Sequence, residues 1–250
     1  MNQATLAPFL ACCLMAPSAW GQEGDAAQER AIATLQELGG RVIRDEARPG
    51  EPVVGVYLTD PRITDAALAH LEGLTALRHL DLSGIQVTDA GLAHLKGLTA
   101  LVTLDVDNTQ VSDAGLAHLK GLTALEILDL DNTQVGDAGL AHLKSLTALE
   151  FLDLENTRVG DAGLAHIEGL TALESLELDN TQVGDAGLAR LKGLTKLRRL
   201  ELPGTKVTDA GLAHIEGLKA LRYLDLRGTQ VSDAGVKEVR RVLPEVEVVR

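Results

Sequence analysis

The chain has 250 residues, of which 45% are hydrophobic and 24% charged, and its formal net charge at pH 7 is −13. Nucleic acid is a poor partner for so acidic a chain, because nucleic-acid binding depends on lysine and arginine. Cysteine occurs only at Cys12 and Cys13, near the N-terminus, so no disulfide framework is expected in the remainder.

The first 21 residues have the composition of a secretory signal peptide. Met1–Gly21 contains no charged side chain and holds one apolar run, followed by the small residues Ala19 and Gly21. We therefore expect residues 1–21 to be cleaved before Gln22. Phe9–Cys12 faintly resembles a lipoprotein cleavage box, which leaves lipidation as an alternative. The apolar run is too short for a good membrane span.

Residues 22–49 differ in pattern from the rest of the chain and are predicted to form an N-terminal cap. An amphipathic helix is expected over residues 26–38, ended by two glycines, and a strand over residues 41–44. The turn sequence at residues 48–51 would return the chain alongside that strand. The cap would cover the open apolar edge of the first repeat.

Residues 50–241 contain eight copies of a 24-residue unit, of which residues 122–145 are typical. A fixed period of this length indicates a solenoid. In the typical unit Leu128 and Leu130 alternate with Asp129 in a short strand, and a helical spacing of apolar residues comes next. The strand motif recurs at residues 80–82, 104–106, 128–130, 152–154, 176–178, 200–202 and 224–226, with 56–58 as a degenerate first copy.

A short helix is predicted in every unit. Aspartate stands in its first turn in all eight copies, where a carboxylate would satisfy free N–H groups and face the positive end of the helix dipole. Glycine follows the helix in six units, where we expect a left-handed closing residue. The aspartates are Asp65, Asp89, Asp113, Asp137, Asp161, Asp185, Asp209 and Asp233, and the glycines are Gly73, Gly97, Gly121, Gly169, Gly193 and Gly217.

Residues 242–250 are predicted to close the other end of the solenoid. A last helix is expected from Ser232, Pro244 ends it, and residues 246–249 favour a final strand. The chain is thus expected to be one elongated domain with a cap at each end.

The frame Leu-x-x-Leu-x-x-Leu-x-Leu, followed by Asn-Thr-x-Val and Asp-Ala-Gly-Leu-Ala-His-Leu, resembles a leucine-rich repeat of the ribonuclease-inhibitor-like type. It is most similar to the 24-residue repeats of bacterial secreted proteins, and also similar to the repeats of F-box proteins. The resemblance implies an α/β solenoid, a right-handed horseshoe with a parallel sheet on its concave face and short helices on its convex face. With the signal peptide, it implies a bacterial protein that is secreted, periplasmic or in the cell envelope.

One departure from the family concerns the turn after the strand. Threonine stands where the family usually has asparagine, and a ladder of hydroxyl groups is expected there, broken at Pro61 and Ile85. The threonines are Thr109, Thr133, Thr157, Thr181, Thr205 and Thr229.

Acidic side chains are expected to form columns on the concave face. One column lies between the two inward leucines of each strand, and a second lies two residues further along. Because neighbouring strands are about 4.8 Å apart, these carboxylates would repel one another and attract a cationic partner. Four units contribute eight of them: Asp105, Asp107, Asp129, Asp131, Asp153, Glu155, Glu177 and Asp179.

A third column, on the other side of the first, is not acidic. Ile127 and Phe151 would be exposed neighbours at the centre of the acidic field, with Arg199 and Tyr223 toward the C-terminal end. An apolar pair ringed by charge is typical of an interface core and its rim. These positions could also be ordinary solvated faces of a repeat stabilised by its leucines. Their variation from unit to unit favours binding.

Few residues are candidates for catalysis or metal binding. Histidine stands at one helix position in six of the eight units, as at His94 and His142. These side chains would point to solvent a full helix spacing apart, so no metal site is expected. His79 lies apart on the concave face, and no Gly-x-Ser-x-Gly, P-loop, His-Glu-x-x-His or Cys-x-x-Cys motif offers it a partner. The acidic columns could attract Ca²⁺, but a flat ladder lacks an enclosing loop. We predict neither enzyme activity nor a cofactor.

The sequence thus predicts a monomeric, exported, non-enzymatic module whose acidic concave face binds a basic or mixed peptide or protein surface. Neither nucleic-acid binding nor a membrane span is expected. Two alternatives stay open. One is an F-box-like adaptor that selects substrates for ubiquitin transfer, although residues 22–50 show no F-box pattern. The other is an architectural or cell-envelope scaffold that partners contact on its helical wall.

Overall fold

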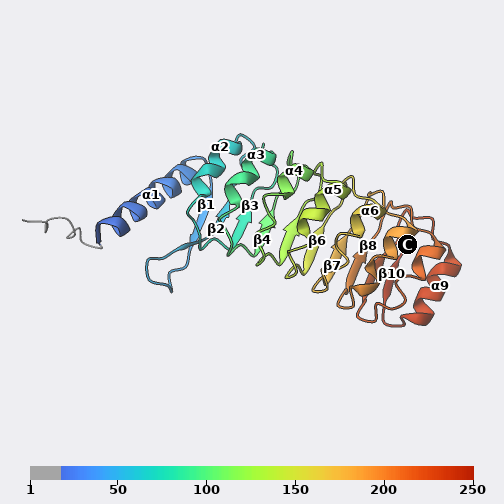
Figure 1. Cartoon of the computed structure of the whole chain (residues 1–250). Coiled ribbons are helices and arrows are strands. Elements are labelled where there is room, and N and C mark those ends of the chain that lie inside the picture. The colour runs from blue at the N-terminus through green and yellow to red at the C-terminus, as the bar shows by residue number, and fades with distance from the viewer. Residues whose placement is uncertain (1–17) are drawn as a thin grey trace, which may run out of the picture.

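The computed structural model describes residues 18–250, which form one curved solenoid built on a ten-stranded sheet (Figure 1). The strands lie in the sheet in the order in which they occur in the chain. β1 pairs antiparallel with β2, and every later pair is parallel. The strands are β1 (Arg41–Arg44), β2 (Val53–Tyr57), β3 (His79–Asp81), β4 (Thr103–Asp105), β5 (Ile127–Asp129), β6 (Phe151–Asp153), β7 (Ser175–Glu177), β8 (Arg199–Glu201), β9 (Tyr223–Asp225) and β10 (Glu247–Val249).

Short helices alternate with these strands. Most are single turns, and four units carry a further 3₁₀ turn. The α-helices are α1 (Ser18–Glu37), α2 (Asp65–Leu68), α3 (Asp89–Leu92), α4 (Asp113–Leu116), α5 (Asp137–Leu140), α6 (Asp161–Leu164), α7 (Asp185–Leu188), α8 (Asp209–Leu212) and α9 (Asp233–Val242), and the 3₁₀ turns are η1 (Ala69–Leu71), η2 (Ala93–Leu95), η3 (Ala141–Leu143) and η4 (Leu191–Gly193).

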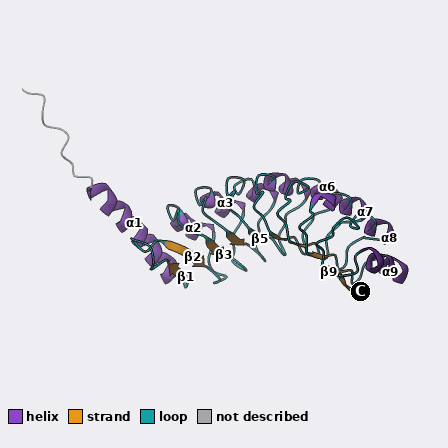
Figure 2. Ribbon diagram, turned by 90° about the horizontal axis from the view of Figure 1, so that it is seen from below, coloured by secondary structure: helices purple, strands orange, loops and turns teal. Residues whose placement is uncertain are grey.

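The helices lie along the outer, convex side of the arc and the strands along its inner side (Figure 2). The curvature results from the packing distances, since neighbouring strands need about 4.8 Å and packed helices about 8–10 Å. The predicted α/β solenoid with a parallel sheet on the concave face is therefore confirmed.

A single apolar core runs the length of the solenoid between these two layers. In the typical unit Leu128 and Leu130 point inward from the strand, Leu140 and Leu143 point inward from the helical side, and all four are fully buried. The other units repeat this set. The inward-facing leucines of the strands and those of the helices therefore pack together in one core.

In most units the left-handed backbone position lies after the strand and not after the helix. Asn108, Asn132, Asn156 and Asn180 all have φ between 50° and 56°, and glycine takes this place in three other units. Among the six helix-end glycines only Gly73 has a positive φ, so the prediction is wrong at Gly97, Gly121, Gly169, Gly193 and Gly217. Asparagine tolerates this conformation better than most residues.

The threonine hydroxyls after the strand form bonds within their own units. Each donates to the carbonyl oxygen three residues earlier at 2.6–2.7 Å, as Thr133 does to Leu130. Thr109, Thr133, Thr157, Thr181 and Thr205 are buried. The threonine hydroxyls thus occupy the same place in successive units, as expected. Each one stabilises the turn of its own unit and does not bond to the next unit.

The first-turn aspartates join each unit to the next. Oδ1 of Asp113 accepts the backbone N–H of Gly136 at 2.6 Å, in the following unit. A Cβ atom added at Gly139 would lie only 2.5 Å from the same oxygen. The predicted structural role is therefore right, but its mechanism differs, because the carboxylate serves the neighbouring unit and not its own helix. The first unit has no preceding aspartate, and there alanine, Ala67, replaces the glycine.

Both ends of the solenoid carry added elements. At the N-terminal end α1 begins earlier than the predicted residue 26, places Ile32 and Leu35 in the core, and is followed by the β1–β2 hairpin. At the C-terminal end β10 adds parallel to β9 after α9 ends at Val242. Residues 1–17 of the predicted signal peptide lie outside the described residues. No helix of residues 18–250 has the length and apolarity that crossing a membrane requires.

Candidate binding surface on the concave sheet

The strand register aligns the acidic residues of successive units. We call the residues between the two inward leucines the inner acidic column. Asp105 pairs in register with Asp129, Asp129 with Asp153, and Asp153 with Glu177. The whole column is Asp81, Asp105, Asp129, Asp153, Glu177, Glu201 and Asp225.

These carboxyl groups are more buried than the sequence suggested. Asp153 is 8% exposed, Glu201 7% and Asp225 0%, while Asp105 and Asp129 are half-buried. Each aspartate also accepts the backbone N–H of the residue two positions on: Oδ1 of Asp153 accepts the N–H of Glu155 at 2.8 Å. The column therefore braces the turn after each strand, in addition to any role in binding.

A second set, the outer acidic column, consists of Asp107, Asp131, Glu155 and Asp179. The following asparagine donates to three of them, as Nδ2 of Asn132 does to Oδ2 of Asp131 at 2.7 Å. Oδ1 of Asp107 and Oδ1 of Asp179 are buried without a hydrogen-bond partner within the described part of the chain. These two oxygens lack a donor.

Burial and mutual repulsion raise the pKa values of several carboxyl groups at the centre of the two columns. Burial, followed by the charges of Asp129 and Glu177, raises the pKa of Asp153 to about 8. The same causes raise the pKa of Asp105 to about 6 and that of Asp179 to about 7. At pH 7 the centre of the face therefore carries less negative charge than its formula implies.

The apolar pair of the third column lies as expected beside this field. Ile127 and Phe151 are register partners on β5 and β6. Ile127 is 40% exposed, one of two large apolar side chains exposed in the described chain, and Phe151 is half-buried. Exposed Glu126 and Glu150 immediately precede them. The pair thus has carboxylates before and after it in both strands.

Toward the C-terminal end the columns are neutralised by arginines. The guanidinium of Arg199 pairs with Glu201 and lies 3.7 Å from Glu177, and its Cζ lies 4.2 Å from the centre of the Tyr223 ring. Nη2 of Arg227 lies 2.6 Å from Oδ2 of Asp225. Burial would raise the pKa of Asp225, but the bonds with Arg227 outweigh it and leave that pKa below its usual value. Arg199 and Tyr223 therefore interact with each other and with acidic residues at the C-terminal end of the sheet. They lie apart from Ile127 and Phe151 in the strand order.

Comparison with known proteins agrees with this architecture. Residues 121–144 and 217–239 match the leucine-rich repeat family. The solenoid is similar to the crystal structure of internalin C2 from Listeria monocytogenes, with 25% identity, 80% of each chain covered and a TM-score of 0.63. The chain is a leucine-rich repeat protein. A second Listeria monocytogenes internalin, inlF, has the same fold at 22% identity and a TM-score of 0.52, covering 90% of this chain and 74% of that one. No curated protein matches.

Leucine-rich repeat proteins are solenoids that offer a long concave surface to protein partners. In this leucine-rich repeat protein that surface carries the acidic columns and the apolar pair. The structure brings Asp105, Asp107, Ile127, Asp129, Asp131, Phe151, Asp153, Glu155, Glu177 and Asp179 together on adjacent strands, and sets Arg199 and Tyr223 at its C-terminal end.

Six of the seven histidines of the leucine-rich repeats lie on the convex wall. Nδ1 of His94 lies 2.5 Å from a carboxylate oxygen of Glu72 in the preceding unit, and His79, on the concave face, contacts Oγ1 of Thr103 at 3.2 Å. No group of three metal-ligating side chains converges among the side chains that the structure describes, those of residues 26–250. These contacts link units in pairs.

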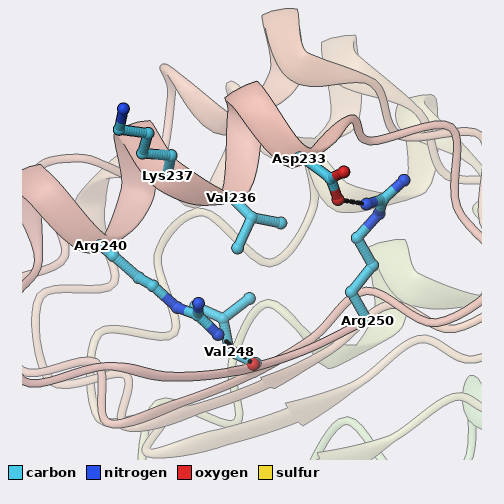
Figure 3. A pocket seen from close by; sticks show the side chains of 6 residues that line it. All are labelled: Asp233, Val236, Lys237, Arg240, Val248 and Arg250. Atoms are coloured by element: carbon cyan, nitrogen blue, oxygen red, sulfur yellow. Dashed lines mark hydrogen bonds and ion pairs between the residues drawn. The ribbon is translucent and has the colours of Figure 1, made fainter.

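A pocket of about 530 Å³ lies at the C-terminal end, between α9 and β10 (Figure 3). Val236 and Val248 line it, Nη2 of Arg240 donates to the Val248 carbonyl at 3.1 Å, and Arg250 pairs with Asp233. Two of its charged side chains, Arg240 and Arg250, thus bond other groups of the pocket wall. The pocket therefore belongs to the C-terminal cap and is separate from the concave face.

Glu126 and Glu150 are surface residues that reasoning from the sequence missed. They precede the strands and lie outside the three predicted columns. The sequence does indicate them, because glutamate recurs at this position in three successive units, ending with Glu174.

Proposed function

We propose that this protein is an exported, non-enzymatic binding module whose concave face takes a protein or peptide with an apolar side chain set among basic residues. The observation that carries the proposal is the pair of exposed Ile127 and half-buried Phe151 within a field of carboxylates. Exposed apolar groups flanked by polar ones are the usual composition of an interface core and rim.

The apolar pair would supply most of the binding free energy. Central, well-packed apolar and aromatic side chains dominate interfaces, whereas each solvated charge contributes little. The carboxylates would instead speed the association of a cationic partner and disfavour the binding of acidic ones. This division of roles distinguishes the proposal from simple charge attraction.

The decisive experiment places a photo-crosslinking amino acid at Ile127 and, as a matched control in the same unit, at His142 on the convex wall. Crosslinks from native extracts at position 127, reduced by Phe151→Ala and competed by a lysine-rich peptide with one central leucine, are expected. Phe151→Ala should weaken this peptide at least about tenfold, or about 1.4 kcal/mol. Asp131→Asn should weaken it less.

Crosslinks confined to position 142 would overturn the proposal in favour of the scaffold alternative. An affinity that is unchanged both by Phe151→Ala and by added salt would also count against the proposal. Salt should weaken the attraction between charges, and loss of a central aromatic group should weaken binding.

Export is the second part of the proposal. It rests on the uncharged leader Met1–Gly21 and its small residues before Gln22. Sequencing the N-terminus of protein from the native source tests it: a chain that begins at Gln22 supports export, and an intact Met1 in the cytoplasm refutes it.

A further inference from the structure

We infer that a cationic partner docks on the concave face by displacing protons from the stacked carboxyl groups, so that docking weakens as the pH falls. The inference rests on the proposed function and adds its regulation. It starts from Asp105, Asp129 and Asp153, which stack in register on three adjacent strands.

The stack is too close and too buried to ionise fully. Register neighbours on adjacent strands are about 4.8 Å apart, and Asp153 is only 8% exposed. Two like charges at that distance cannot share a poorly solvated site without one of them gaining a proton. The backbone N–H of Glu155 already occupies Oδ1 of Asp153 at 2.8 Å, which leaves Oδ2 to carry the proton.

The neighbouring outer column points the same way. Oδ1 of Asp107 and Oδ1 of Asp179 are buried and have no donor within the described chain. A buried acceptor without a donor is costly. A protonated carboxyl is both donor and acceptor, so a proton held in this cluster would supply a donor of the kind that these oxygens lack. Incoming ammonium or guanidinium groups could replace that proton.

The surrounding charges confine the effect to the central units. Arg199 on β8 and Arg227 after β9 compensate Glu201 and Asp225, and Tyr223 lies between them. At the other end His79 on β3 faces Thr103. Burial is the largest cause of the pKa shifts of Asp105, Asp129 and Asp153; neighbouring carboxylates add to it, and the backbone N–H two residues on opposes it. The directions of these pKa shifts, all upward, agree with the geometry.

The first test needs no partner. Carbon-detected NMR of the side-chain carboxyl groups in the whole protein should show Asp105 and Asp153 titrating well above pH 4, and Asp225, the matched control in the same column, below it. Central carboxyls that titrate near pH 4 would overturn the inference and leave the proposed docking face intact.

The second test measures coupling with a lysine oligopeptide that carries one leucine. Its affinity should rise about tenfold or more between pH 5 and pH 8, with one or more protons released. Calorimetry in phosphate and in Tris, which differ in ionisation enthalpy, counts those protons. In the double variant Asp105→Asn, Asp153→Asn the rise should fall below about threefold. The convex histidines and the remaining carboxyl groups with raised pKa values, such as Asp179, are unchanged in this variant, so the rise that is left measures their joint contribution.

Each result of the second test decides the matter. Equal affinity at both pH values, or binding without proton release, overturns the coupling while the docking face stands. A peptide that does not bind at either pH, on a protein whose central carboxyls titrate as expected, overturns the proposed function itself.

Discussion

The central and C-terminal parts of the inner acidic column use one repeat position in opposite ways. Asp153 and Asp225 are both buried, and each accepts the N–H of the residue two places on, at 2.8 and 3.0 Å. Yet the pKa of Asp153 is raised to about 8 and that of Asp225 is lowered. The difference comes from the neighbours, since Arg227 pairs with Asp225 whereas carboxylates surround Asp153.

One surface substitution accounts for most of this contrast. In the 24-residue alignment Arg227 occupies the place of Asp131 in the central unit. Both side chains follow a buried leucine and precede the left-handed turn residue, Gly228 or Asn132. A leucine-rich repeat can therefore change the charge of its concave face while core and turn stay the same.

The largest expected effect comes from making the C-terminal unit resemble the centre. Arg227→Asp leaves buried Asp225 without its partner and beside a like charge. We expect the largest loss of stability at pH 8, although it should stay below that of a fully buried pair because Arg227 is itself exposed. The loss should shrink at pH 5, where Asp225 can accept a proton. Urea unfolding measures both, and Arg227→Gln, which removes charge only, should cost about half as much.

The comparison assumes that the central and C-terminal units share the same packing beneath the concave surface. Gly139→Ala and Gly235→Ala test this, since a Cβ at either position would press on the aspartate of the preceding unit. Each should lower the free energy of unfolding by about 1–3 kcal/mol. Gly121→Ala is the control, because nothing lies within 4 Å of the added Cβ. Unequal losses at Gly139 and Gly235 would mean that the two regions differ below the surface as well.

The pH dependence of stability is the next test, because raised pKa values occur in the central units whereas the pKa of Asp225 is lowered. Asp105, Asp153 and Asp179 have folded-state pKa values of about 6, 8 and 7, above the ordinary 3.8. The folded protein then holds protons that the unfolded chain has lost, so stability falls as the pH rises from about 4 to 8. We expect a fall of at least about 1 kcal/mol, the equivalent of one pKa unit.

Urea midpoints at pH 5 and pH 8 measure this fall. Asp153→Asn should flatten it by raising stability at pH 8 and leaving it nearly unchanged at pH 5, because the amide oxygen can still accept the N–H of Glu155. A wild-type protein equally stable at both pH values would contradict the raised values in the centre.

The smallest effect is expected from the reverse exchange. Asp131→Arg places a cation beside Asp129 as Arg227 lies beside Asp225. Stability should change by no more than about 0.5–1 kcal/mol, because the new pair is partly solvated. The pKa of Asp129, raised in the wild type, should fall, and carboxyl NMR measures it. An unchanged pKa would show that burial alone sets its value.

The fold was predictable because its signals are local and repeated. The spacing of Leu128, Leu130, Leu140 and Leu143 is enough to define a strand, a helix and a shared core, and the repetition of that spacing defines the solenoid. The site was predictable to the level of which side chains face the hollow. Ile127 and Asp129 were placed there by alternation along a strand.

The relations between units could not be predicted from the sequence. The bond from Asp113 to Gly136 joins residues 23 positions apart and is invisible to a pattern within one helix. The burial of Asp153 depends on its neighbours' side chains, so it could not be derived from its place in a strand. The left-handed turn was assigned to the glycines that end the helices, whereas asparagine adopts it after the strand.

The aspartate that reaches 23 residues ahead also bears on how such a chain can change length over evolutionary time. Loss or duplication of one complete 24-residue unit recreates the same junction, because every incoming unit brings its own carboxylate and its own vacant glycine site. A shorter insertion within the unit would separate the two halves of that junction. Recombination between copies can therefore lengthen or shorten the arc, and with it the footprint offered to a partner, without any compensating change elsewhere.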